Sequence, residues 1–262
     1  IAAAAMARDD DDRFNSVTTF TAQTDCTEPG EIKVFLNESQ LTFLRVMMKR
    51  DGFMDGPKFA NSFAALNVND LVWKPLVDRY LLGEETQLID LMAWNKDLTR
   101  VPYKAHYRWI KEIFIENALA EDRYRLNGKT VHLSDLRVPL CFVATTTDHV
   151  APWRSVYKIH RLAGNTEVTF ILTNGGHNAG IACGAKHPRR KHQISTRKPG
   201  TGYVSPDTWA EETPVEPGAW WSSWDTWLKQ RSAGDPVEPP GMGTPRKYKP
   251  LCDAPGTYVH LR

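Results

Sequence analysis

Residues 138–181, with the sequence VPLCFVATTTDHVAPWRSVYKIHRLAGNTEVTFILTNGGHNAGI, decide the fold of this chain. Within them, residues 140–144 form a short apolar run that is typical of a buried strand. An amphipathic segment then runs from Pro152 to a stop signal at Gly164, which predicts a helix. A second apolar run, residues 168–172, predicts another strand. Strand, helix and strand within this length predict two parallel strands of an α/β sheet, joined by a right-handed crossover.

One acidic residue and one histidine follow these two strands. Asp148 lies on the loop after the first strand, and a turn with two glycines leads from the second strand to His177. Loops that follow parallel strands meet at one edge of the sheet, where open α/β proteins bind their ligands. An acid followed by a histidine is also the chain order of the last two members of a nucleophile, acid and histidine triad on α/β-hydrolase scaffolds.

These residue types suit the activation of a nucleophile. A thiol or hydroxyl is a weak nucleophile until a base takes its proton, and an imidazole with a pKa near ~6.5 can accept and later return that proton. A carboxylate behind the ring fixes its tautomer. In a purely structural interpretation, Asp148 caps the helix that begins near Pro152 and His177 is an ordinary loop histidine. The spacing alone leaves both interpretations open.

Composition narrows the class of protein. The chain has 262 residues and a net charge of +2, which does not demand nucleic acid or membrane as a partner. No run approaches the ~18 apolar residues of a membrane span, and no basic leader precedes an apolar core, so we expect a cytosolic protein. The four cysteines are scattered without a CxxC pair, which favours reduced thiols.

The beginning of the chain resembles the interior of a longer core. The first residue is Ile1, and IAAAAMA is typical of a helix already under way. Residues 16–22 predict a strand that lies directly before the two strands already placed. In α/β-hydrolase order the nucleophile precedes this helix, so we expect it upstream of Ile1. Residues 1–25 are therefore predicted to be a truncated part of the α/β core.

Residues 26–134 are predicted to form a helical cap inserted into that core. Helices are expected to begin near Asn37, Pro57, Asp70 and Pro102, with a kink at Pro75 in the third helix. An Asn-Gly pair at 127–128 predicts a small hairpin that leads back to the sheet. Such insertions act as lids that exclude water and gate substrate. The core then resumes over residues 135–262.

Several further segments have open interpretations. The basic stretch 186–198, KHPRRKHQISTRK, is interpreted as a solvated loop, with a site for the phosphates of a carrier such as coenzyme A as the alternative. Nucleic acid is disfavoured because no aromatic residues interleave these charges. Cys183, His187 and His192 resemble metal ligands but lack a fourth ligand and a recognised spacing. Tryptophans at 220, 221, 224 and 227 predict a core-packing helix face, and the proline-rich residues 235–250 an extended, exposed tail.

Seven stretches of the chain occur, in the same order, in one known protein family. They are AQTDCTEPGE with FLNES (22–39), NDLVW with YLLG (69–83), DLMAWNKDLTRVPY (90–103), TDHVAPWRSVY (147–157), GGHNAGI (175–181), GAWWSSWDTWL (218–228) and DAPGTYV (253–259). In these stretches the chain resembles the C-terminal part of class I and II polyhydroxyalkanoate synthases. That resemblance implies an α/β-hydrolase fold and an acyltransferase that polymerises 3-hydroxyacyl-CoA into polyester and releases CoA.

The resemblance also implies site residues and partners. The family has a Cys, His and Asp triad, whose acid matches Asp148 within TDHVAPW and whose histidine matches His177 within GGHNAGI. Its cysteine lies in a GxCxGG elbow, which this sequence lacks, and none of the four cysteines present fits that place. The fragment alone is therefore expected to be inactive. The implied partners are 3-hydroxyacyl-CoA and the growing polyester, a second copy in a homodimer, and the surface of cytoplasmic polymer granules. No metal and no further cofactor is implied.

Two further residues and two other functions were also considered. Asp25 follows the preceding strand, where some α/β-hydrolases place their acid, but the match to TDHVAPW favours Asp148. His149, next to the acid, is expected to shape the loop. An esterase, thioesterase or polyester depolymerase would use the same triad with water as the acceptor. In the remaining alternative, the chain is a non-catalytic fragment that binds a partner.

Overall fold

The computed structural model describes residues 1–58, 68–85, 94, 99–232, 234–244, 246–253 and 256–257. The chain divides into two compact units, Ile1–Arg231 and Ser232–Arg262. The described residues of the second unit are almost all exposed, as predicted for the tail, and an isolated bridge joins Thr244 to Tyr248. No helix in the described ranges is both long and apolar enough to cross a bilayer. The candidate residues lie in the first unit.

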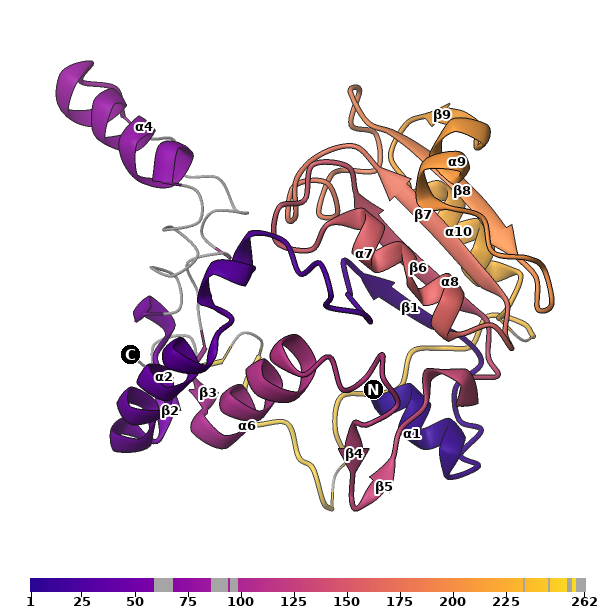
Figure 1. Ribbon diagram of the computed structural model, residues 1–262. Coiled ribbons are helices and arrows are strands. Elements are labelled where there is room, and N and C mark those ends of the chain that lie inside the picture. The colour runs from indigo at the N-terminus through magenta and orange to yellow at the C-terminus, as the bar shows by residue number, and fades with distance from the viewer. Residues whose placement is uncertain are drawn as a thin grey trace. The chain divides into compact units, whose positions relative to one another are not determined.

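A five-stranded sheet in the order β1-β6-β7-β8-β9 organises the first unit (Figure 1). Its strands are β1 (Val17–Phe20), β6 (Leu140–Thr145), β7 (Val168–Thr173), β8 (Lys191–Arg197) and β9 (Val215–Pro217). The first three are parallel neighbours, and β8 and β9 continue the sheet antiparallel. The predicted α/β fold is therefore confirmed, with the crossover strands side by side.

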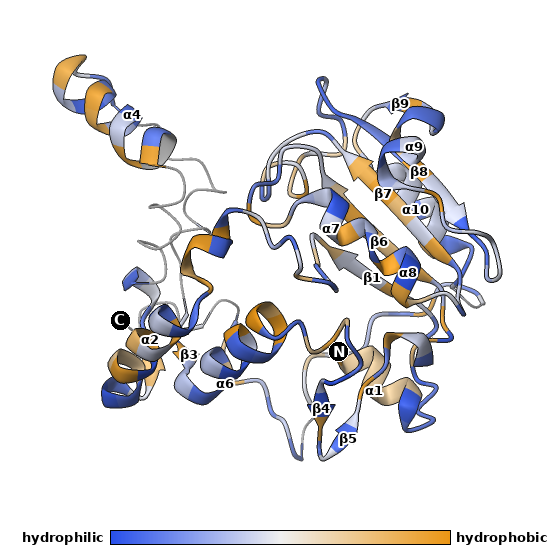
Figure 2. Cartoon of the chain, in the orientation of Figure 1, coloured by the Kyte–Doolittle hydropathy of each residue, from blue (hydrophilic) through white to orange (hydrophobic). Residues whose placement is uncertain are grey.

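The two central strands are buried along their whole length. Every residue of β6 (LCFVAT) and β7 (VTFILT) is buried, and both strands are orange over much of their length in Figure 2. Continuous apolar runs of this kind belong to parallel strands that are covered on both faces. The pattern that predicted them is thus the direct consequence of their place in the sheet.

Successive residues of a strand point to opposite faces of the sheet, so β6 and β7 place apolar side chains on both faces. Helices cover each face and bury these side chains. Phe142 and Phe170 belong to a core cluster with Val156, Ile159 and Trp209. These three lie on α7 (Trp153–Tyr157), α8 (Ile159–Leu162) and α9 (Pro206–Glu212).

The opposite face of the sheet is covered by one helix. Cys141, Val143 and Ile171 pack in a second cluster against Trp220 and Trp227 at the start and within α10 (Trp221–Lys229). The tryptophan stripe is therefore core packing, as the sequence predicts.

The structure corrects two expectations in this half of the chain. The single helix expected after Pro152 is two short helices. The backbone amides of Lys158 and Arg161 donate to carbonyls three residues back instead of four, which interrupts the α-helical pattern. The basic stretch 186–198 is not simply a solvated loop, since Lys191–Arg197 is strand β8. Its period of two is hard to detect because Ile194 is its only large apolar residue, while pairing with the buried β7 holds it in place.

The segment 26–134 contains most of the remaining elements. They are η1 (Glu31–Phe35), α2 (Glu38–Asp51), β2 (Phe53–Met54), the helical run η2 (Asn69–Trp73), α4 (Lys74–Leu76) and η3 (Val77–Leu81), β3 (Val101–Pro102), α6 (Tyr103–Arg108) with η4 (Trp109–Ile115), β4 (Arg125–Leu126), β5 (Lys129–Thr130) and η5 (Leu133–Asp135). Helix α1 (Ala2–Arg8) precedes β1. The helix expected from Pro57 falls mostly outside the described residues.

Local signals set the bounds of these elements. Asn37 caps α2 by accepting a hydrogen bond from the Gln40 amide at 2.9 Å, and Gly52 ends the helix in the left-handed region, as predicted. The run that holds Pro75 has its α-helical turn between two π-helical segments. Residues 127–128 form the predicted hairpin turn between β4 and β5.

Candidate active site

Asp148 and His177 meet at the carboxyl ends of two neighbouring parallel strands. Nδ1 of His177 lies 2.7 Å from Oδ2 of Asp148. Strand β6 ends at Thr145 opposite Thr173 of β7, so both loops leave the sheet at the same edge. In a neutral ring whose Nδ1–H donates a hydrogen bond to the carboxylate, Nε2 is the free base. The arrangement can therefore accept a proton from a nucleophile.

The carboxylate of Asp148 is fully buried and serves two purposes at once. Its Oδ2 faces the imidazole, while its Oδ1 accepts hydrogen bonds from the amides of Val150 at 2.9 Å and Ala151 at 2.7 Å. Helix α7 begins after Pro152 without a side-chain cap, so the interpretation of Asp148 as its cap is wrong. The acid ties down its own loop and presents one oxygen to the histidine.

The imidazole of His177 is more open, with 34% of its side chain exposed. Its loop is joined to the acid loop by a hydrogen bond from the Thr147 amide to the Gly175 carbonyl at 3.2 Å. The solvent can thus reach the base but not the acid behind it, which is the arrangement that proton transfer to an incoming group needs.

Two tryptophans hold the far end of the histidine loop. The indole of Trp220 donates to the Ile181 carbonyl at 3.3 Å, and that of Trp221 donates to the Cys183 carbonyl at 2.8 Å. Their rings stack with centroids 4.0 Å apart. The spacing of these residues in the sequence predicts core packing alone. The sequence does hold one signal for these hydrogen bonds, because an indole N–H inside a protein needs an acceptor. That signal does not identify which carbonyl accepts.

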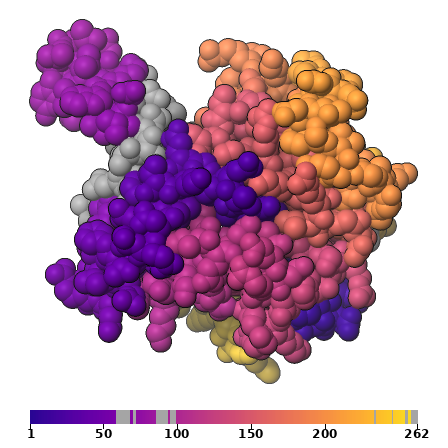
Figure 3. Space-filling view, in the orientation of Figure 1, coloured from indigo at the N-terminus to yellow at the C-terminus, as the bar shows by residue number. Residues whose placement is uncertain are grey.

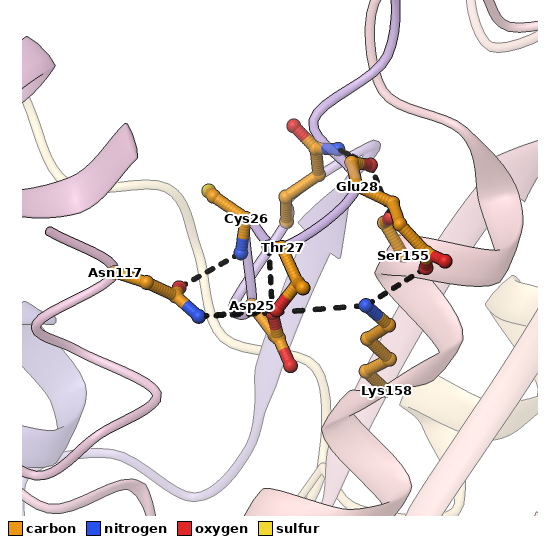
Figure 4. A network of polar contacts seen from close by, with 8 residues as sticks. Asp25, Cys26, Thr27, Glu28, Asn117, Ser155 and Lys158 are labelled. Carbon is orange, nitrogen blue, oxygen red and sulfur yellow. Dashed lines mark hydrogen bonds and ion pairs between the residues drawn. The ribbon is translucent and has the colours of Figure 1, made fainter. Parts of the chain in front are cut away.

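Asp25, the residue just before the 26–134 segment, lies in a network of hydrogen bonds and an ion pair (Figure 4). Its Oδ1 accepts from the Thr27 amide at 2.8 Å and from the Asn117 side chain at 3.0 Å, and Lys158 lies 3.7 Å away. Burial by itself raises the pKa of Asp25, but the hydrogen bonds and the positive charge of Lys158 outweigh it and leave that pKa below its usual value. The structure pairs His177 with Asp148 rather than with Asp25.

Asn117 joins a late part of the segment 26–134 to the beginning of that segment. It adopts a positive φ of 47°, and its Oδ1 accepts from the Cys26 amide at 2.9 Å while its amide group reaches Asp25. Asparagine tolerates this left-handed backbone better than most residues. Residues 25 and 26, where the segment begins, are therefore held to residue 117 by hydrogen bonds.

Residues 28–31, which follow Asp25 in the chain, pack on the loop that carries Asp148. The Glu31 amide donates to the His149 carbonyl at 3.0 Å, and the Ser155 hydroxyl donates to the Glu28 carbonyl at 2.6 Å. Gly30 has φ +84°, and a Cβ there would lie 2.5 Å from the His149 carbonyl oxygen. In Figure 3 the indigo chain after β1 lies against the rose segment that contains this loop. His149 contributes its backbone here, which agrees with the expected loop-shaping role.

A cavity of about 330 Å³ lies beside this junction. Cys26, Lys33 and Leu36 line it on one side, and Phe114 and Asn117 on the other. Burial, and next the nearby Asp25, raise the pKa of Cys26 to about 12, so its thiol stays protonated near neutral pH. Burial likewise raises the pKa of Cys141 to about 12. Neither thiol suits the part of an activated nucleophile.

The suggested metal ligands do not converge. Cys183 contacts the Gly180 carbonyl, and Nδ1 of His187 accepts from the Arg189 amide at 3.3 Å. His192 is buried between the Gly218 carbonyl and the Ser223 hydroxyl. In the part of the chain that the structure describes, no three His, Cys, Asp or Glu residues are grouped so as to hold a metal ion.

Comparison with known proteins adds independent information. No protein-family model matches the chain. The chain is 34% identical to the poly(3-hydroxyalkanoate) polymerase subunit PhaC of Rhizobium etli over 98% of its length, and 33% identical to that of Rhizobium meliloti over 98%. It is 33% identical to the poly(3-hydroxyalkanoate) polymerase of Methylorubrum extorquens over 95%. These matches cover 39%, 41% and 40% of the relatives, so the chain spans about two fifths of their length.

Proposed function

The chain belongs to the poly(3-hydroxyalkanoate) polymerase family, and on that premise we propose that it is the C-terminal catalytic part of such a polymerase. Asp148 and His177 are then two members of a Cys-His-Asp triad whose cysteine lies upstream of Ile1 in the longer protein. The observation that carries the proposal is the 2.7 Å contact between these two side chains at the edge of the sheet.

The proposed reaction has two acyl transfers. His177 takes the proton of the cysteine thiol, the thiolate attacks the thioester carbonyl of 3-hydroxyacyl-CoA, and the C–S bond to CoA breaks, so that CoA leaves as a thiol with the proton. The imidazole next takes the proton of a 3-hydroxyl group, whose oxygen attacks an acyl thioester. An ester bond forms as the C–S bond of that thioester breaks, the sulfur leaves as a thiol with the proton from the imidazolium, and the polyester grows by one unit. Asp148 keeps Nδ1 protonated throughout and stabilises the imidazolium.

Water must stay out of this site, because hydrolysis of the acyl thioester competes with chain extension. We propose that the helical segment 26–134 is the lid that excludes it. Two contacts support this. The hydrogen bond between Asn117 and Asp25 holds a late part of the segment to the residue before its start, and the packing of Gly30 on the acid loop holds its beginning against the loop that carries Asp148. The proposal extends to a homodimer in the cytoplasm that works at the surface of polymer granules, as the family resemblance implies.

The test compares two proteins. The product of the complete coding sequence, which we expect to carry a GxCxGG elbow upstream of Ile1, and the 262-residue chain are each incubated with 3-hydroxybutyryl-CoA and a thiol reagent. We expect the complete protein to release CoA and form polymer, and the 262-residue chain to do neither. CoA release without polymer would instead assign a thioesterase, and polymer formation by the 262-residue chain would overturn the upstream nucleophile.

A further inference from the structure

The histidine loop is built around the side chain of Arg190. The loop follows β7, and Arg190 lies just before β8, where the chain returns to pair with β7. Its Nη1 donates to the Asn174 carbonyl at 2.8 Å, and its Nη2 donates to the Ala179 carbonyl at 2.6 Å. One carbonyl precedes His177 and the other follows it. A single guanidinium therefore bridges the two sides of the loop that carries the imidazole.

The backbone around Arg190 is fixed in turn by the loop. The Asn174 side chain donates to the Arg189 carbonyl at 3.0 Å and accepts from the Lys191 amide at 2.9 Å. The Asn174 amide donates to the Lys191 carbonyl at 3.1 Å. These bonds hold the main chain on both sides of Arg190, so the guanidinium is presented to the loop in one place.

The guanidinium of Arg190 lies close against the backbone of the loop at Gly175. Gly175 has φ +119°, a backbone conformation that residues with a Cβ rarely adopt. A Cβ at Gly175 would overlap Nη1 of Arg190 and lie 2.9 Å from the Cα of Gly180. The glycine of the GGHNAGI stretch thus makes room for the guanidinium.

The charge of Arg190 is directed to these carbonyls. Within the described ranges it makes no ion pair with a carboxylate, and its buried Nε has no hydrogen-bond partner there. A charged donor strengthens hydrogen bonds to carbonyl oxygens, and the planar fork of arginine can reach two acceptors at once. Lysine keeps the charge but lacks the fork.

We infer that Arg190 is a positioning residue for His177: its guanidinium bridges the carbonyls on either side of the histidine and thereby holds the imidazole against Asp148. The inference deepens the proposed function and rests on the role of His177 as the base there. It also gives one residue of the basic stretch 186–198 a purpose that neither a solvated loop nor a phosphate site describes.

The first experiment measures position without activity. In the NMR spectrum of the chain, we expect the Nδ1 proton between His177 and Asp148 to give a downfield resonance, which His177→Gln would identify by its loss. We expect Arg190→Ala to broaden or abolish this resonance, and Arg189→Ala, which changes an exposed neighbour, to leave it intact. Circular dichroism and thermal melts check folding. If Arg190→Ala does not fold, Arg190→Lys is measured in its place. An unchanged resonance in the folded variant would overturn the inference.

The second experiment measures catalysis in the complete gene product. We expect Arg190→Ala to lower kcat for CoA release about 10- to 100-fold with KM nearly unchanged, because a base displaced by a fraction of an ångström transfers protons poorly. Arg190→Lys should restore little, and added guanidinium chloride at millimolar concentration should restore part of the loss in Arg190→Ala. A kcat equal to that of Arg189→Ala would refute the role of Arg190. If the unsubstituted protein were inactive, the proposed function would fail while the NMR result still decided the positioning.

Discussion

The acid loop and the histidine loop leave the same edge of the sheet but are held in different ways. Asp148 fastens its own loop, because its Oδ1 binds the amides of residues two and three positions later. His177 does not fasten its loop. Arg190, Trp220 and Trp221, which lie 13 to 44 positions further along the chain, hold it from outside.

The difference separates two kinds of preorganisation. A loop fixed by its own side chain needs only a short stretch of sequence, and a substitution that removes the oxygens of that side chain disturbs loop and chemistry together. In a loop fixed from outside, one residue carries the reacting group and other residues hold the backbone in position. The second arrangement predicts residues whose loss affects catalysis without contact with the substrate.

The largest effect is expected for Asp148→Asn, which separates the two purposes of the acid. The amide oxygen can still accept from Val150 and Ala151, but the amide nitrogen would face His177 and force the wrong tautomer on the ring. We expect CoA release by the complete polymerase to fall about 10³- to 10⁴-fold, with the free energy of unfolding changed by less than about 1 kcal/mol.

Asp148→Ala is the companion to this variant. It leaves two buried amides without an acceptor and should also cost about 2–4 kcal/mol in urea unfolding. Equal stability of the Asn and Ala variants would contradict the view that Asp148 fastens its own loop.

A second histidine, His160, sharpens the contrast, because it is buried and pairs with no carboxylate in the part of the chain that the structure describes. Burial, and next the positive charge of Arg197, lower the pKa of His160 from 6.5 to about 4. The native state therefore favours the neutral ring, while the unfolded chain takes up a proton below pH ~6.5. The free energy of unfolding is thus at its full value above pH ~6.5 and decreases as the pH falls toward 4. The loss amounts to ~3 kcal/mol at 1.36 kcal/mol per pKa unit.

Urea unfolding of the chain between pH 7 and 4 measures this dependence. His160→Gln should flatten the curve, whereas His187→Gln, on a surface turn, should leave its slope as it is. A slope that persists in His160→Gln would show that another group controls acid stability.

Gly175→Ala tests the loop that is held from outside. The new methyl group meets Arg190 and Gly180 at a backbone φ of +119°, so we expect a loss of about 1–3 kcal/mol in the free energy of unfolding. The shared Nδ1 proton resonance of His177 should weaken as well. Gly184→Ala is the matched control, because a Cβ there meets open space. Similar losses in both variants would show that the approach of Arg190 does not matter.

The smallest effect is expected for Trp221→Phe, which removes one indole hydrogen bond and keeps an aromatic ring. The Cys183 carbonyl loses its donor, and we expect a loss of about 1 kcal/mol with a small shift of the His177 resonance. Trp224→Phe removes a comparable bond, to the Thr18 hydroxyl on β1, and should destabilise the chain without that shift. If the His177 resonance were identical in the two variants, the hydrogen bond of Trp221 would have no part in positioning the histidine loop.

Much of the core could be predicted from local patterns. The apolar runs of β6 and β7, the cap at Asn37 and the Asn-Gly turn at residue 127 each depend on neighbouring residues, and the structure has all of them. Strand β8 was missed because its residues are mostly polar and its stability comes from pairing with β7. Helix α9 was missed although Ser205 and Pro206 form a recognisable start.

The sequence by itself determined that an acid and a histidine follow two neighbouring parallel strands, because strand periodicity and turn residues are local properties. Only the tertiary structure decided how firmly the two meet. Arg190, the two tryptophans and the Asp25–Asn117 fastening act through hydrogen bonds between residues far apart in the chain. No periodicity encodes such partners, since each bond forms only after the sheet and its helices have brought the groups within about 3 Å.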